Sequence, residues 1–415
     1  MSQQENIPSV WKNKEFISFI FLRFSLIFAL FIQSTSVAFE IFRLTKKELF
    51  LGLIGLFEFA PILFTAFYAG QLVDKLDKRK VIIRCIASFM LSSFVLLIVN
   101  FPSIREQIGI TSYLVASYFA FFILGITRAF SGPAVFSLLA VVVRKENYEK
   151  AIPLSSSAFM IGSVLGPLAG GLLIAGFGIE TALATAFVFM CVSMIMILRI
   201  APKPAIEEDQ SDETPLQRIK EGFKFILATP IILAVLSLDM FAVFFGGAES
   251  LLPAVTEKLL KAGPVEFGWL RSAHGIGSLI MLFFLSSLPL LKSKVGPKLL
   301  YSVGLFGVCI IVFGLSRNVY LSFFILMLAG AFDAVSMIIR QSILQYKTPE
   351  HLKGRVSSVN SVFVSSSNEL GALESGLAAT FLGLVPAILF GGSMTILTVI
   401  IIAICFRQVR KVTLE

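Results

Sequence analysis

The feature that most constrains this 415-residue chain is a series of long apolar segments, which recur from residue 15 to residue 406. A helix needs about 20 apolar residues to cross the hydrocarbon core of a bilayer, and each segment reaches that length. Hydrophobic side chains make up 56% of the residues, which is incompatible with a water-soluble domain. We therefore predict an all-α membrane protein with twelve transmembrane helices. The predicted helices cover residues 15–40, 49–73, 80–101, 112–141, 151–176, 179–200, 229–255, 265–291, 297–316, 318–341, 354–380 and 384–406.

The basic residues indicate how the helices are oriented. The formal net charge is +9, and the densest basic cluster lies between the second and third segments, at Lys75, Lys78, Arg79, Lys80 and Arg84. Positive residues favour the cytoplasmic side during insertion. We expect both termini to be cytoplasmic, the first segment to be retained as a transmembrane helix, and the protein to reside in a bacterial inner membrane. This explanation of the charge argues against nucleic acid as a partner.

One hydrophilic stretch divides the chain nearly in half. We predict an N-terminal six-helix bundle over residues 1–200, a cytoplasmic linker over 201–228 and a C-terminal six-helix bundle over 229–415. The linker begins with an acidic run and continues with Leu216, Ile219, Phe223 and Ile226 at helical spacing. That spacing predicts an amphipathic helix on the inner leaflet.

The two halves share a pattern of small residues. At a constant offset of 205 residues, glycines, alanines and serines coincide, and with an offset of 216 Gly52 meets Gly268 and Glu58 meets His274. Parallel repeats of this kind occur in transporters that hold their substrate between the halves. The coinciding pairs are Gly125 and Gly330, Ala129 and Ala334, Ser131 and Ser336, Ser137 and Ser342, Gly166 and Gly371, and Gly171 and Gly376.

Charged residues inside the predicted helices are the strongest functional signal. An ionisable group at bilayer depth costs roughly 3 kcal/mol or more, so such groups persist where they pair, line a cavity or carry a proton. Three basic residues cannot neutralise six acids one-to-one, so we expect some acids to carry protons. The embedded charges are Arg23, Arg128 and Arg271 against Glu58, Asp239, Glu249, Asp333, Glu369 and Glu374.

We assign provisional roles to these residues. The candidates for proton coupling are Asp239, Asp333, Glu369 and Glu58, with Asp239 and Asp333 preferred. The candidates for substrate binding or charge relay are Arg128, Arg23, Arg271, Glu249, His274 and Glu374. Glu249 and Arg271 lie in the outer third of their segments and could pair as a gate. For each residue, a purely structural hydrogen bond or ion pair is the alternative.

Cysteine and histidine give no sign of a metal site. The four cysteines, Cys85, Cys191, Cys309 and Cys405, stand singly in apolar segments, and the chain has two histidines. None of them has metal-ligand spacing. We expect no metal, no cofactor and no enzymatic activity.

Three sequence motifs lead to a family. Residues 70–80 read GQLVDKLDKRK, residues 162–171 read GSVLGPLAGG, and Arg128 is followed by glycine four residues later. The first resembles the signature between helices two and three of the major facilitator superfamily, with Asp77 in place of the usual glycine. The second resembles its antiporter signature. Blocks at 237–253, 331–340, 354–356 and 367–376 resemble the drug:proton antiporter branch.

The resemblance implies two pseudo-symmetric six-helix bundles and further functional residues. Those implied to latch the halves together are Gly70, Asp74, Lys75, Arg79 and Arg355. Those implied to form the antiporter face of helix five are Gly162, Gly166, Pro167, Gly170 and Gly171.

The leading hypothesis is a monomeric, proton-coupled exporter of an amphipathic small molecule, either a drug-like compound or a siderophore. Its partners would be the small-molecule substrate, protons and membrane lipids. The alternatives are a lipid or lysolipid flippase of the same fold and a non-transporting membrane sensor.

Overall fold

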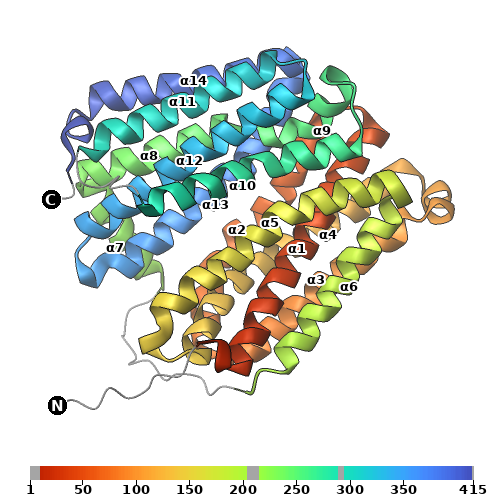
Figure 1. Ribbon diagram of the computed structural model, residues 1–415, viewed down its shortest axis with the longest axis horizontal. Helices are drawn as coiled ribbons and strands as arrows, with labels where there is room; N and C mark the ends of the chain where they lie inside the picture. Colours follow the sequence, from red (N-terminus) through yellow and green to blue (C-terminus); the bar gives the residue numbers. More distant parts are fainter. Residues whose placement is uncertain (1–9, 203–214, 288–293, 414–415) are drawn as a thin grey trace. The chain divides into compact units, whose positions relative to one another are not determined.

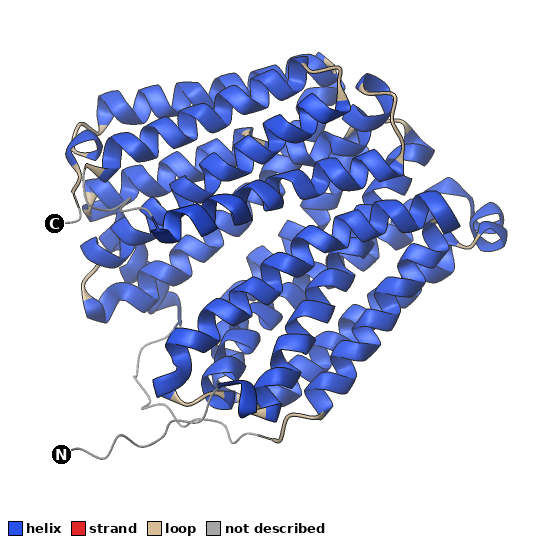
Figure 2. Ribbon diagram, viewed as in Figure 1, coloured by secondary structure: helices blue, strands red, loops and turns tan. Residues whose placement is uncertain are grey.

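The computed structural model describes residues 10–202, 215–287 and 294–413, and these residues form helices with no strand among them (Figure 2). The predicted all-α membrane architecture is confirmed, with a helix at each predicted segment. The end of the 265–291 segment lies outside the described residues. The long helices are α1 (Lys14–Thr45), α2 (Leu49–Lys75), α3 (Lys78–Asn100), α4 (Pro102–Val142), α5 (Tyr148–Phe177), α6 (Ile179–Leu198), α7 (Pro215–Ala228), α8 (Pro230–Phe245), α10 (Pro264–Ser287), α11 (Val295–Leu315), α12 (Val319–Lys347), α13 (Lys353–Leu382) and α14 (Leu384–Cys405).

Among the described residues, ten helical spans are long and apolar enough, by length and composition, to cross a membrane. The two remaining predicted segments correspond to α2, whose apolar part is Leu49–Thr65, and to α13. Helix α13 has ample length, at 30 residues, but carries serines, asparagines and glutamates along much of it. Such a polar helix crosses a membrane only where protein or water covers it.

The contacts divide the chain into two compact units. Unit 1 comprises residues 1–36 and 64–211, and unit 2 comprises residues 37–63 and 212–415. Helices α1 and α2 therefore each contribute to both units. The acidic part of the predicted linker, residues 203–214, lies outside the described residues. The domain boundaries at residues 200 and 228 remain a prediction.

In unit 1 the glycine-rich face of α5 packs directly against α1. A Cβ atom added at Gly162 would lie 3.1 Å from the backbone nitrogen of Phe28, and one at Gly166 would lie 3.0 Å from its carbonyl oxygen. Small residues four apart allow helices in membranes to approach this closely. Helix α5 also continues without interruption through Pro167.

In unit 2 helix α10 packs along α12, and α11 packs between α12 and α14 (Figure 1). The approach of α10 to α12 depends on two glycines. A Cβ atom at Gly277 would lie 1.7 Å from the Met327 carbonyl oxygen, and one at Gly330 would lie 2.0 Å from the His274 carbonyl oxygen. Neither position has room for any other residue.

Helix α7 follows the undescribed part of the linker and packs against α13. Glu221 forms an ion pair with Arg355, and the Phe223 ring stacks on Phe363 with centroids 6.4 Å apart. Ile226 is buried in a cluster that includes Val356. Protein therefore covers part of the apolar face that the sequence places on the inner leaflet. The Leu216 and Ile219 side chains lie outside the described residues.

Two helices depart from the simple spans predicted. Helix α4 begins at Pro102, earlier than residue 112, and changes direction at Gly109, whose φ of 72° is readily available only to glycine. The helix predicted over residues 229–255 is regular only as far as Phe245, where α8 ends. It continues as a 3₁₀ turn η3 (Gly247–Leu251), the short α9 (Leu252–Ala254) and a π-helical turn η4 (Val255–Leu259). Such irregular turns often mark functional sites.

Two ion pairs join the α1–α2 connection to η4 within unit 2. Lys46 pairs with Glu257, and the Lys258 ammonium lies 2.7 Å from a Glu48 carboxylate oxygen. Lys258 also donates to the Lys46 carbonyl oxygen and lies 5.3 Å from the centre of the Phe42 ring. These shared contacts explain why residues 37–63 group with the C-terminal helices.

Reversing one charge of this connection tests its contribution. We expect Lys258→Glu to lower stability by about 1–2 kcal/mol, because it removes one pair and places like charges beside Glu48 and Glu257. The exchange of both members, Lys258→Glu with Glu48→Lys, should recover most of the loss. Thermal unfolding of the detergent-solubilised protein measures both. Equal instability of the single and double variants would show that the pair contributes nothing.

Candidate functional site

A histidine held between two acids forms the first part of a polar network in unit 2. His274 of α10 pairs through Nδ1 with Glu249 of η3. Its Nε2 lies 3.4 Å from Oδ2 of Asp333 on α12. The side chains of His274, Glu249 and Asp333 are 24%, 41% and 38% exposed to solvent, respectively. Each ring nitrogen therefore faces a different carboxylate.

The local backbone explains how these residues meet. Helix α8 ends at Phe245 with Gly246 as its cap, and the 3₁₀ turn that follows carries Glu249. Gly330 lies one turn before Asp333 and brings α12 against the backbone of His274. Ser278 of α10 donates to the Gly330 carbonyl oxygen at 2.9 Å, which fixes the register of the two helices.

A buried ion pair forms the second part of the network. Asp239 of α8 pairs with Arg340 of α12, and their side chains are 8% and 9% exposed. A buried pair of this kind is stable only while both members remain, because either charge alone would be costly at this depth. Asp239 therefore has a fixed cationic partner.

A small cavity separates the two parts. Asp239 and Asp333 both line it, together with Ser336, Phe306 and apolar side chains. Its volume is about 10 Å³, which is close to the minimum needed for one water molecule. Two carboxylates and a hydroxyl supply the polar partners that a buried water requires.

The arrangement has a clear chemical capacity. A neutral imidazole carries a proton on one nitrogen and accepts on the other, so it can take a proton at one side and release it at the other. His274 is placed to pass a proton between Glu249 and Asp333. A water in the cavity would extend the path from Asp333 to Asp239.

The other embedded acids are two candidates for proton coupling, Glu58 and Glu369, and one for substrate binding or charge relay, Glu374, and they lie on α2 and α13. Glu58 is buried on α2, and Glu369 lies on α13, where its carbonyl oxygen would be 2.4 Å from a Cβ atom at Gly55. Glu374, also on α13, accepts a hydrogen bond of 3.4 Å from Ser375. Glu58 and Glu369 both have further interactions within the protein.

The three arginines predicted to balance the acids have separate environments. Arg23 lies over the ring of Phe159, 5.7 Å from its centre, inside unit 1. Arg128 is half-buried on α4 and interacts within the protein. Arg271 lies one turn before His274 and is close enough to interact electrostatically with Glu249. Glu249 thus pairs with His274, and Arg271 is a secondary neighbour.

Counting the embedded charges from sequence omitted Arg340. The predicted helix ended at residue 341, which placed Arg340 at the membrane surface, whereas α12 continues to Lys347 and buries it. A fourth basic residue therefore offsets the acids. The signal in the sequence was the stretch from Arg340 to Thr348, which contains no helix-breaking residue before Pro349.

Two of the residues implied to latch the halves, Arg79 and Arg355, have partners inside their own units. Arg79 donates to the Ile197 and Leu198 carbonyl oxygens at 3.3 and 3.2 Å, which satisfies the end of α6. Arg355 pairs with Glu221 of α7. Gly70, Asp74 and Lys75 lie in α2, and their side-chain surroundings are outside the described part of the structure.

Comparison with known proteins agrees with this architecture. Over residues 16–372 the chain matches the Major Facilitator Superfamily. It is 27% identical to the enterobactin exporter EntS of Escherichia coli O1:K1 / APEC over 350 residues, covering 82% of this chain and 80% of the relative. It is 26% identical to the enterobactin exporter EntS of Shigella boydii serotype 4, covering 97% and 96%.

Solved structures share the fold at low identity. A point mutant of the nucleoside transporter NupG aligns with a TM-score of 0.74 at 13% identity, over 94% of this chain and 100% of that one. The human organic anion transporter MFSD10 aligns with a TM-score of 0.65 at 16% identity, over 95% and 100%. The resemblance in sequence motifs is thereby confirmed, and this multi-pass membrane protein belongs to the Major Facilitator Superfamily of transporters.

Proposed function

We propose that this transporter exports an amphipathic small molecule across a bacterial inner membrane in exchange for protons. The observation that carries the proposal is the network in unit 2, in which His274 links Glu249 to Asp333 and a cavity links Asp333 to the Asp239–Arg340 pair. A membrane protein that needed only stability would gain more from apolar side chains at these positions.

The roles within the network follow from the partners. Asp333 is the proposed central proton carrier, because it faces the histidine on one side and the cavity on the other. Glu249 is the proposed entry or exit group. Asp239, held by Arg340, is the proposed inner terminus, where an arriving proton would weaken the ion pair. Protonation there would couple proton arrival to a rearrangement of α8 against α12.

The substrate class is proposed from the relatives. Both named relatives are enterobactin exporters and match most of this chain. A siderophore of that kind is aromatic and anionic, so Arg23 and Arg128 of unit 1 would provide favourable charge. Broad drug export would instead favour cations through the acids of unit 2.

We also propose that the protein is monomeric with both termini in the cytoplasm. The support for this orientation is the basic cluster of residues 75–84 beside the second and third helices. With this orientation, export from a cell appears as uptake into everted membrane vesicles.

Everted vesicles test the function directly. Vesicles energised by respiration should accumulate enterobactin, a catecholate anion, in preference to ethidium, a cation, and collapse of the pH gradient with nigericin should stop accumulation. Accumulation of ethidium alone would support the drug-like alternative. Accumulation that ignores nigericin would contradict proton exchange.

A further inference from the structure

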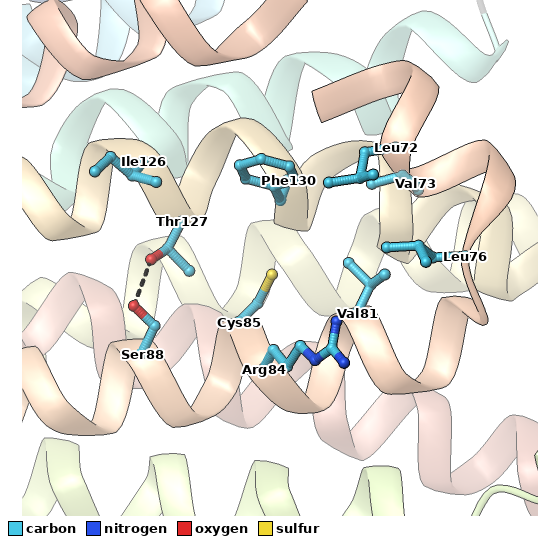
Figure 3. A pocket seen from close by; sticks show the side chains of 10 residues that line it. All are labelled: Leu72, Val73, Leu76, Val81, Arg84, Cys85, Ser88, Ile126, Thr127 and Phe130. Atoms are coloured by element: carbon cyan, nitrogen blue, oxygen red, sulfur yellow. Dashed lines mark hydrogen bonds between the residues drawn. The ribbon is translucent and has the colours of Figure 1, made fainter. Parts of the chain in front are cut away.

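Unit 1 contains a cavity that the proposed transport path does not use. It has a volume of about 240 Å³ and lies among α2, α3 and α4 (Figure 3). Its walls are mostly apolar and include Leu72, Leu76, Ile126 and Phe130. A cavity of this size and lining fits a hydrocarbon chain, and its polar groups determine what that chain is attached to.

The polar groups of the cavity are divided between its two ends. At one end the Ser88 and Thr127 hydroxyls lie 2.8 Å apart, and Thr127 also donates to the Ile123 carbonyl oxygen at 2.8 Å. These hydroxyls satisfy one another, so that end requires no polar group from a ligand. Figure 3 shows Ser88 farther along α3 than Arg84, with its hydroxyl directed toward Thr127.

Arg84 is the charged residue of the lining. It is exposed, and among the described residues it has no ion pair or hydrogen bond from its side chain. A guanidinium presents up to five donors and binds phosphate or carboxylate groups well. The cavity therefore offers an anion site at one end and a hydrocarbon site at the other.

The depth of the cavity points to a lipid. Arg84 lies six residues beyond the start of α3 at Lys78, or about 9 Å along the helix, and Ser88 lies about 15 Å along it. Residues 75–80 are rich in lysine and arginine, which favour the level of the headgroups. Arg84 is thus placed just below the headgroups, and Ser88 at the depth of the acyl chains.

We propose that this cavity binds an anionic phospholipid of the inner leaflet, with the phosphate on Arg84 and one acyl chain between α2, α3 and α4. Charge complementarity selects the anion, since a zwitterionic lipid also carries a cation that Arg84 would repel. A small free anion would leave the apolar walls uncovered.

Native mass spectrometry of the whole protein in detergent tests the proposal, with dioleoylphosphatidylglycerol and dioleoylphosphatidylcholine as probes. We expect tighter binding of phosphatidylglycerol, and about fivefold weaker binding by Arg84→Gln. Arg84→Lys should retain most of the affinity. Lys80→Gln is the matched control, because Lys80 is an exposed cation one turn away that does not line the cavity. It should change affinity by less than about twofold.

A second variant separates the cavity from the surface charge. Ser88→Phe fills the acyl end while leaving Arg84 in place, and it should weaken phosphatidylglycerol binding as Arg84→Gln does. Equal loss in Lys80→Gln and Arg84→Gln, or equal binding of the two lipids, would overturn the proposal. Displacement of the bound lipid by enterobactin would assign the cavity to the transported molecule and would also overturn it.

Discussion

Replacing Gly330 by alanine is expected to lower the stability of this transporter by about 3 kcal/mol and to abolish transport. The added methyl group would lie 2.0 Å from the His274 carbonyl oxygen. This oxygen belongs to the helix backbone, so it cannot move away by a side-chain rotation. Helices α10 and α12 must then separate, and overpacking of this kind typically costs about 1–3 kcal/mol. Thermal unfolding in detergent measures the stability, and uptake by everted vesicles measures the activity.

A second glycine supplies the matched control. Gly304 of α11 belongs to the same unit, and a Cβ atom there would have no neighbour within 4 Å. Gly304→Ala should leave transport unchanged and raise stability slightly, by up to about 1 kcal/mol, because alanine is the better helix former. If the two variants behaved alike, the close packing of α10 on α12 would be wrong.

The second large effect is expected from the buried ion pair. Arg340→Met should destabilise the protein by about 3–5 kcal/mol, because it leaves the Asp239 carboxylate buried without its partner. The double variant, Arg340→Met with Asp239→Leu, removes both charges and should recover most of that stability. Chemical or thermal unfolding of these variants and of Asp239→Leu completes a double-mutant cycle.

Transport by the double variant distinguishes structure from mechanism. If Asp239 is the inner terminus of the proton path, the double variant folds but loses coupling between the pH gradient and export. If the pair serves stability alone, the double variant transports as well as the wild type. Full coupled transport by that variant would remove Asp239 from the mechanism.

The sequence was sufficient for the membrane architecture and the family. An apolar segment long enough to cross the hydrocarbon core must satisfy its own backbone hydrogen bonds, and a single segment does so as an α-helix. Residues 70–80 and 162–171 carry the motifs of the family. The small-residue face of α5 packs closely on α1, as such a face predicts. These are local properties, and each can be evaluated within one segment.

The site depends on contacts that no single segment encodes. Glu249 and His274 are 25 positions apart, and they meet because the helix changes to a 3₁₀ turn after Gly246. Arg340 and Asp239 are farther apart still in the sequence. Predicting their ion pair would have required knowing that α12 extends to Lys347 and buries Arg340. Depth alone suggested a pair of Glu249 with Arg271, which does lie close enough to interact electrostatically, but it gave no sign of the direct contact with His274.

Glycines also explain the limits of sequence prediction. Gly109 permits a bend that lengthens α4, whereas Gly330 permits close contact with α10. Gly109 lies just before the predicted 112–141 segment and Gly330 lies inside the 318–341 segment, and the sequence around them does not tell a bend from a contact. The same ambiguity affects the acids, since buried Asp239 and half-exposed Asp333 both appear simply as aspartates in apolar helices.

Proton movement driven by substrate provides the most direct test of the proposed mechanism. In proteoliposomes that contain a pH-sensitive dye, an imposed gradient of enterobactin should move protons in the opposite direction through the wild type. Asp333→Asn should abolish this movement, whereas Glu106→Gln, which alters an exposed acid of unit 1, should not. Undiminished, substrate-dependent proton movement through Asp333→Asn would contradict the role assigned to the Glu249–His274–Asp333 network.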